Sequence, residues 1–292
     1  MSGLKHTKRR IVSAKNTQKV TRAMKLVSSA KFARAHHNIN NAKHYAESLD
    51  LILAKLRANL VEDYEKISLV EKRPEKNSLL IVITSDRGLC GALNTNVIKS
   101  ALGFLEDKER SNVKTKLFLW GRKAQSLSKK KNFELVSSSL KVLEKPSYDF
   151  CRKQLDGIFQ DFKQGKWDSV YVAYSKFKNV ISQQAQVLRI LPHDLQEGAE
   201  RKNKTEIDLN VSIEPLNVEF LEKVIESKVT DVLFQVLLEG SASDHAARMT
   251  AMDSATSNAD KVIGDLTLEY NRARQAAITK ELIEITSGAE AL

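Results

Sequence analysis

Apolar and small residues recur at alternating steps of three and four along both ends of this 292-residue chain. Near the N-terminus the stripe runs through Leu4, Thr7, Ile11, Ala14, Gln18, Thr21, Lys25, Ser28, Phe32, Ala35, Ile39, Ala42, Ala46, Leu49, Leu53, Leu56 and Leu60. Near the C-terminus it runs through Ala242, His245, Met249, Met252, Thr256, Ala259, Ile263, Leu266, Tyr270, Ala273, Ala277 and Lys280. This spacing is the heptad of a coiled coil. It predicts two long helices, over residues 4–60 and from residue 217 to the end.

All four prolines lie between Pro74 and Pro215, so neither end carries the residue that most reliably breaks a helix. We therefore divide the chain into an N-terminal coiled-coil helix (1–73), a globular domain (74–210) and a C-terminal coiled-coil helix (211–292). Both helices adjoin the globular domain. If they pair with each other, they must pair antiparallel.

The two predicted helices differ in length. At about 1.5 Å per residue, the first measures about 85 Å and the second about 110 Å, so the second extends about 27 Å beyond the start of the first. This last stretch carries Ala276, Ala277, Ile278, Ile283 and Ile285. A single helix with that much apolar surface needs a cover. The overshoot therefore predicts a socket in another protein, and the change of heptad phase near Gly240 predicts a local irregularity.

The middle of the chain alternates between strand and helix patterns. Apolar, β-branched runs predict strands at 79–84, 116–120, 169–174 and 180–191. Helical patterns occur at 92–106, 122–129 and 147–163, and the basic, polar stretch 196–205 has the composition of a mobile loop. Strand and helix in alternation are typical of an α/β domain.

Charge is unevenly distributed along the chain, whose net charge is +11. No acidic residue precedes Glu47, whereas eleven basic residues do: Lys5, Lys8, Arg9, Arg10, Lys15, Lys19, Arg22, Lys25, Lys31, Arg34 and Lys43. Such a surface indicates an acidic partner, which charge alone leaves open among nucleic acid, anionic lipid and acidic protein loops. The two cysteines, Cys90 and Cys151, are too few for a disulfide framework. No apolar run approaches the roughly 20 residues that span a bilayer, and the N-terminus lacks the apolar core of a signal peptide.

One turn, at residues 87–91, lies where a doubly wound sheet would bind a phosphate. It contains Gly88 and Gly91 but lacks the lysine and hydroxyl of a P-loop and the spacing of the dinucleotide fingerprint. We therefore interpret the glycines as residues needed for a tight turn rather than as a nucleotide site. The adjacent Ser243, Asp244 and His245 point in different directions on a helix and form no catalytic relay.

Five motifs resemble the γ subunit of the F-type rotary ATP synthase. They occur in family order at 16–24 (Asn16-Thr17-Gln18-Lys19 leading to Ala23-Met24), 85–91 (Ser-Asp-Arg-Gly-Leu-Cys-Gly), 246–249 (Ala-Ala-Arg-Met), 273–277 (Ala-Arg-Gln-Ala-Ala) and 278–291, which begins Ile-Thr-Lys-Glu and closes on Gly-Ala-Glu-Ala. The resemblance implies an antiparallel coiled coil of the terminal helices plus a Rossmann-like α/β domain that binds no nucleotide.

The resemblance also implies a role. The coiled coil would be a single-copy shaft inside a ring of α and β subunits, and the globular domain would form a foot with the ε subunit on the c-ring. It implies no catalytic residue, cofactor or metal in this chain, no nucleic-acid partner and no membrane span. The expected location is peripheral, at the cytoplasmic face of a bacterial inner membrane, where the complex couples ion flow to ATP synthesis.

Seven residues match functional positions of that family. Met24, Arg248, Arg274, Gln275, Thr279 and Glu281 match positions where the shaft meets a β subunit or where its helices couple near it. Glu214 matches a position that faces the c-ring, although Ile213 stands beside it where the family often has an aromatic residue.

Two other functions remain as alternatives. A basic coiled coil can grip nucleic acid through phosphate contacts, although aromatic residues for base stacking are missing from the first helix apart from Phe32 and Tyr45. An enzyme built on the turn at Gly88 is the other alternative, which tight binding of ATP or NAD would support.

Overall fold

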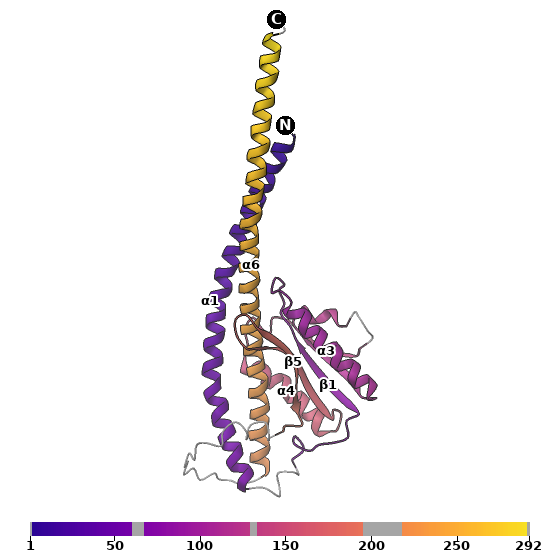
Figure 1. Cartoon of the computed structure of the whole chain (residues 1–292). Helices are drawn as coiled ribbons and strands as arrows, with labels where there is room; N and C mark the ends of the chain where they lie inside the picture. The colour runs from indigo at the N-terminus through magenta and orange to yellow at the C-terminus, as the bar shows by residue number, and fades with distance from the viewer. Residues whose placement is uncertain (1, 60–66, 129–132, 195–217, 291–292) are drawn as a thin grey trace. The chain divides into compact units, whose positions relative to one another are not determined.

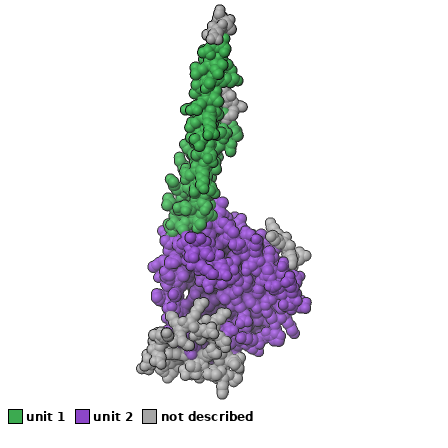
Figure 2. All heavy atoms as spheres, viewed as in Figure 1, with its two compact units in different colours: residues 1–30, 248–292 green, residues 31–247 purple. Residues whose placement is uncertain are grey.

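The computed structural model describes residues 2–59, 67–128, 133–194 and 218–290. The chain divides into two compact units, one of residues 1–30 with 248–292 and one of residues 31–247 (Figure 2). Two long helices, α1 (Ser2–Asn59) and α6 (Val218–Glu290), contribute to both units (Figure 1). Some predicted features lie outside the described residues. They are the last stripe position, Leu60, the loop at 196–205, and Ile213 with Glu214.

The heptad on α1 is confirmed. Every described position of its predicted stripe, from Leu4 to Leu56, is buried or half-buried. On α6 the stripe is buried or half-buried from Ala242 to Tyr270, after which Ala273 and Lys280 are exposed. Along α6 the helix continues through Gly240 without a break.

Contacts within the first unit show that the two helices run antiparallel. Thr21 meets Thr256, Lys25 meets Asp253, and Gln18 lies against Asp260. A step forward along α1 therefore matches an equal step back along α6. This register puts Leu4 level with Arg274, so the rest of α6 extends past the described start of α1 (Figure 1).

The second unit contains a five-stranded sheet in the order β3-β2-β1-β4-β5. The strands β1 (Asn77–Ile83), β2 (Lys114–Trp120), β3 (Leu135–Ser139) and β4 (Ser169–Phe177) are parallel, and β5 (Gln183–Leu191) pairs antiparallel with β4. Helix α3 (Leu93–Arg110) joins β1 to β2, and α4 (Tyr148–Lys163) joins β3 to β4. The α/β prediction is thus confirmed.

Alternate residues of β1 face two different apolar layers, as the period of a strand requires. Leu80 and Val82 pack with α3, whereas Leu79, Ile81 and Ile83 belong to a cluster with α4. The base of α6 belongs to this second cluster too, through Leu221, Ile225, Val229, Leu233, Val236 and Leu237. Helix α6 is therefore part of the α/β core as well as of the coiled coil.

Three local predictions need correction. The helix expected at 122–129 is only a short 3-10 turn, Ala124–Ser126. The last strand begins at Gln183, because Asn179 Oδ1 accepts from the backbone of Ile181 and Ser182 in the preceding turn. Strand β3 was not predicted, since its sequence is short and rich in serine.

Candidate partner-binding surfaces and the strand-end pocket

Small polar side chains lie between α1 and α6 in the first unit. The Thr256 hydroxyl donates to the Thr21 hydroxyl at 2.7 Å, and both threonines are buried. Lys25 Nζ lies 2.5 Å from Asp253 Oδ1. These contacts join α1 and α6 at this level of the first unit.

The outward surface of α1 combines cations with apolar side chains. Val12, Val20 and Val27 are all exposed, and Met24 between them is half-buried. The lysines and arginines of residues 5–22 are exposed. No acidic side chain of α1 offsets them before Glu47, so this surface suits an acidic partner with apolar anchor points.

The sequence-predicted contact residues fall into three places. Arg274, Gln275, Thr279 and Glu281 are exposed on the same stretch of α6, where the Thr279 hydroxyl donates to the Gln275 carbonyl at 3.0 Å. Met24 lies beside Lys25 on α1. Arg248 differs from the residues at the end of α6, because it is only 7% exposed. Glu214 lies outside the described residues. Their roles remain predictions.

Beyond Arg274, α6 presents apolar side chains without burying them. Ile278, Leu282 and Ile283 are all about half exposed or more, and Ile285 is 67% exposed. Isolated exposed apolar residues are common on proteins, but a cluster on one helix end is typical of an interaction surface.

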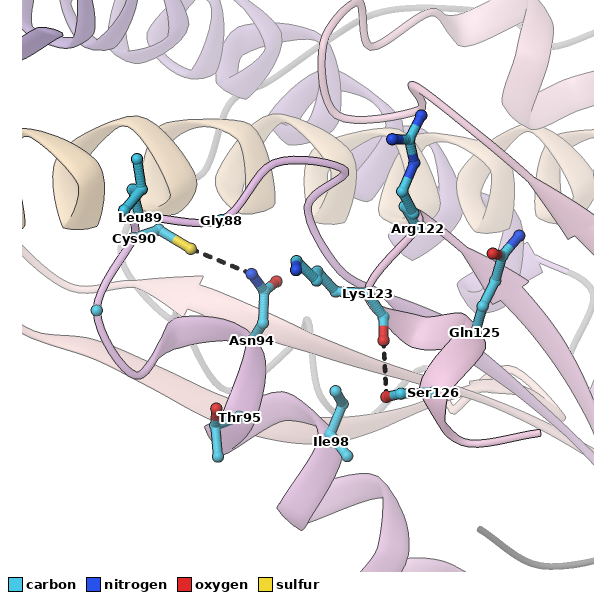
Figure 3. A pocket seen from close by; sticks show the side chains of 11 residues that line it. Gly88, Leu89, Cys90, Asn94, Thr95, Ile98, Arg122, Lys123, Gln125 and Ser126 are labelled. Carbon is cyan, nitrogen blue, oxygen red and sulfur yellow. Dashed lines mark hydrogen bonds between the residues drawn. The ribbon is translucent and has the colours of Figure 1, made fainter. Parts of the chain in front are cut away.

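A pocket of about 540 Å³ opens at the carboxyl ends of β1 and β2 (Figure 3). Its lining comes from the turn after β1, the first turns of α3 and the turn after β2, and includes Gly88, Cys90, Asn94, Ile98, Arg122 and Lys123. The lining residues that the structure describes include no carboxylate and no histidine. The pocket therefore offers cations and amides but no acid–base pair.

Hydrogen bonds hold the loops around this pocket in place. Asn94 accepts from the Ser85 backbone at 2.9 Å and donates to Cys90 Sγ at 3.1 Å (Figure 3). Asp86 accepts from the backbone N–H groups of Arg122 at 3.2 Å and Lys141 at 2.8 Å, so it ties together the loops that follow the neighbouring parallel strands β1, β2 and β3. Ser85 and Asp86, the first residues of the motif at 85–91, therefore serve to hold these loops together.

Gly121 is required where β2 ends. Its φ is +95°, and a Cβ there would lie 2.0 Å from the Thr84 carbonyl oxygen. A side chain cannot fit against that backbone atom. Glycine is therefore needed at the point where the chain leaves β2 and enters the 3-10 turn.

Sequence reasoning missed the environment of α6 at residues 239–247. Ser243 is fully buried, and its hydroxyl donates to the Ser175 carbonyl at 3.0 Å. Ala247 packs with Cys90 and Leu93. The available signal was the run of small residues at 240–247, in which glycine, serine and alanine predominate. Burial raises the pKa of Glu239, which lies at the start of this stretch.

Two findings concern metal sites and membrane spans. Among the described residues, no cluster of three or more His, Cys, Asp or Glu side chains is placed to hold a metal ion. A search of the same residues finds no helix with the length and apolar character needed to cross a membrane.

Comparisons with known proteins cover the whole chain. A family model described as ATP synthase matches residues 3–292. The ATP synthase gamma chain of Trichlorobacter lovleyi is 40% identical over 293 residues, which cover 100% of this chain and 99% of that protein. The gamma chain of Pelagibacter ubique is 37% identical over 295 residues and covers 100% of both chains.

Solved structures share the fold. A chain of the Euglena gracilis mitochondrial ATP synthase, in a structure of OSCP, F1 and c-ring, matches with a TM-score of 0.68 at 19% identity, covering 99% of this chain and 94% of that one. A chain from the central stalk and c-ring structure of the Tetrahymena thermophila enzyme matches with a TM-score of 0.58 at 23% identity, covering 81% and 99%.

Proposed function

We propose that this chain, which belongs to the ATP synthase gamma-chain family, is the central rotor shaft of an F-type ATP synthase. In this role it couples ion-driven rotation of the c-ring to conformational cycling of the catalytic β subunits. The observation that carries the proposal is the end of α6, which continues past its partner helix with its apolar side chains uncovered.

An apolar collar would stabilise this end. Burying one isoleucine or leucine side chain contributes about 1.5–3 kcal/mol, and Ile278, Leu282, Ile283 and Ile285 are all available. The α and β subunits form this collar in our proposal. Arg274, Gln275, Thr279 and Glu281 lie on the same stretch and make its polar contacts.

The shaft can drive the β subunits because its surface differs around its circumference. Residues 2–30 of α1 carry cations and no acid, whereas α6 carries both signs, including Asp253 and Glu281. A shaft of two unlike helices cannot present equal contacts to three surrounding β subunits. Each orientation therefore favours a different conformation in each β subunit, which is a population shift caused by differential contact.

The remaining parts of the proposal concern the complex. The chain supplies no catalytic residue, cofactor or metal site and acts as an essential subunit in single copy. Its α/β domain joins the ε subunit, and Glu214 faces the c-ring. The complex resides at the inner face of a bacterial membrane. Within it, Met24 and Arg248 of the shaft take part in coupling to the β subunits.

A photocrosslinking experiment tests this placement. A photoreactive amino acid replaces Ile285 in the assembled, membrane-bound complex, and the matched control carries it at Ile181, which is 86% exposed in the turn between β4 and β5. We expect the Ile285 position to crosslink to α or β and to stop ATP hydrolysis. We expect no α or β product from the Ile181 position.

Two results would refute the proposal. One is a complex of α and β subunits from which this chain is absent. The other is a chain that crosslinks at Ile285 to nucleic acid, with binding that weakens steeply as salt increases, because that behaviour belongs to a phosphate-binding coiled coil.

A further inference from the structure

The order of the strands defines one crevice in the sheet. From β1 the chain moves to β2 and β3 on one side, and then returns to β4 on the other side of β1. The connections therefore diverge at the carboxyl ends of β1 and β4. In open α/β sheets this switch point is where ligands bind.

Helix α6 lies in this crevice. Val82 of β1 pairs with Ala173 of β4, so Ser175 lies just past the end of β1. The buried Ser243 of α6 donates to the carbonyl of that same Ser175. Ala247, one helical turn further on, packs against Cys90 and Leu93, which follow β1.

The approach of α6 is close because its side chains there are small. Gly240 lies against the loop that follows β3, and a Cβ on it would come 3.1 Å from Leu143 Cδ2. Ala242, Ser243, Ala246 and Ala247 are all buried. Helix α6 thus contacts the loops that follow β1 and β3 and the carboxyl end of β4.

We propose that residues 239–247 of α6 occupy the ligand crevice of the α/β domain and form a torque-transmitting joint there. The inference rests on the proposed function as a rotor. Gly240, Ser243 and Ala247 are the positioning residues of this joint.

The joint is a second attachment point. The first is the apolar base of α6, up to Leu237, which packs on the sheet with α4. This first attachment holds by shape and burial alone, because apolar contact is non-directional. The crevice contact adds a directional hydrogen bond and a close steric fit between Gly240 and Leu143, so the domain cannot twist about α6 without losing both.

A size exchange tests the joint in the assembled complex. Gly240→Leu places a side chain where Leu143 stands, and Leu143→Ala in the same chain makes room for it. The matched control is Gly157→Leu, because Gly157 is exposed on α4 and a Cβ there would meet no atom within 4 Å.

The first readout uses the chain's own cysteines. Cys90 is 2% exposed beneath Ala247, whereas Cys151 is fully buried in the core cluster with α4. We expect Gly240→Leu to speed thiol labelling of Cys90 about tenfold, which corresponds to about 1.4 kcal/mol of overpacking. Labelling of Cys151 stays slow, because the core remains folded. The double variant and Gly157→Leu label at the wild-type rate.

The second readout is torsional stiffness. A gold rod is attached through Ile181→Cys, the head is fixed to a surface, and the angular fluctuations of the rod are recorded without nucleotide. We expect Gly240→Leu to lose stiffness, and the added Leu143→Ala to restore it. A purely structural role would leave the stiffness of all variants equal.

The outcomes separate this inference from the proposed function. Unchanged Cys90 labelling in Gly240→Leu would show that α6 does not fill the crevice, and faster labelling with unchanged stiffness would show that the contact carries no torque. Either result overturns the joint. If the wild-type complex fails to rotate when ATP is added, the rotor function itself is wrong.

Discussion

Two buried titratable groups at the base of the helices should make opposite contributions to stability. Asp231 on α6 is 1% exposed, and burial raises the pKa of its carboxyl to about 6, although Lys228 opposes the shift. After β5, burial lowers the pKa of His193 to about 4, an effect that Lys228 reinforces and Asp50 opposes. Lys228 Nζ itself lies 2.6 Å from Asp50 Oδ1.

The sign of each contribution follows from which state binds the proton more tightly. Because the pKa of Asp231 is raised from 3.8 to about 6, the stability that Asp231 contributes is present below about pH 4 and is lost as the pH rises through about 6. Because the pKa of His193 is lowered from 6.5, the stability it contributes is present above pH 6.5 and is lost as the pH falls to about 4. At about 1.4 kcal/mol per tenfold change in proton affinity, each amounts to about 3 kcal/mol.

The two contributions therefore nearly cancel in the wild-type chain, and single substitutions expose them. We expect Asp231→Asn to raise the free energy of unfolding at pH 7 by about 3 kcal/mol and to lose this advantage by pH 4. We expect His193→Gln to match the wild type at pH 7 and to exceed it by about 3 kcal/mol at pH 4. Lys228 keeps its ion pair with Asp50 in both variants.

Urea unfolding of the full chain, followed by tryptophan fluorescence at several pH values, measures these differences. The chain has two tryptophans, Trp120 and Trp167, and both are buried in the α/β core. Asp156→Asn, at an exposed position of α4, serves as the control and should change nothing. If Asp231→Asn destabilises the chain at pH 7, or if its advantage persists at pH 4, the electrostatic reasoning is wrong.

Three further predictions concern the coiled coil. Thr21→Val should cost less than about 1 kcal/mol of stability, because the buried Thr256 hydroxyl loses this partner but still donates to the Met252 carbonyl at 2.7 Å; thermal unfolding by circular dichroism measures the change, and a loss of several kcal/mol would contradict this. Deleting residues 281–292 should leave tryptophan-detected unfolding unchanged but lower the yield of assembled complex, whereas loss of globular structure would argue against the division of the chain. Met24→Lys adds charge to an already basic surface, so it should lower the number of ions pumped per ATP hydrolysed more than it lowers assembly; an unchanged ratio would count against a coupling role.

The coiled coil could be predicted from sequence because its packing repeats at a constant period. Each core position from Leu4 to Leu56 can be identified from its constant spacing to the next one. The pairing register then determines where α6 extends beyond the start of α1. The predicted antiparallel pairing and the exposed end at Ile285 followed from this periodicity and from the unequal lengths of the helices.

The contacts of α6 with the sheet could not be predicted in the same way. Leu233 and Ser243 lie on one continuous helix, but the first packs on the sheet face and the second on the strand ends, and no local pattern distinguishes these surroundings. Strand β3 was missed because its serines carry little apolar signal, and the 3-10 turn after Gly121 depends on a close approach to Thr84 from a distant part of the sequence.

The central claim is that this chain turns inside a complex whose other subunits hydrolyse or synthesise ATP. Direct observation of a probe attached through Ile181→Cys, with the α and β subunits fixed to a surface, tests it most simply. Addition of ATP should produce stepwise rotation in one direction that stops when the end of α6 is crosslinked to the head. A probe that stays still while the complex hydrolyses ATP would contradict the account.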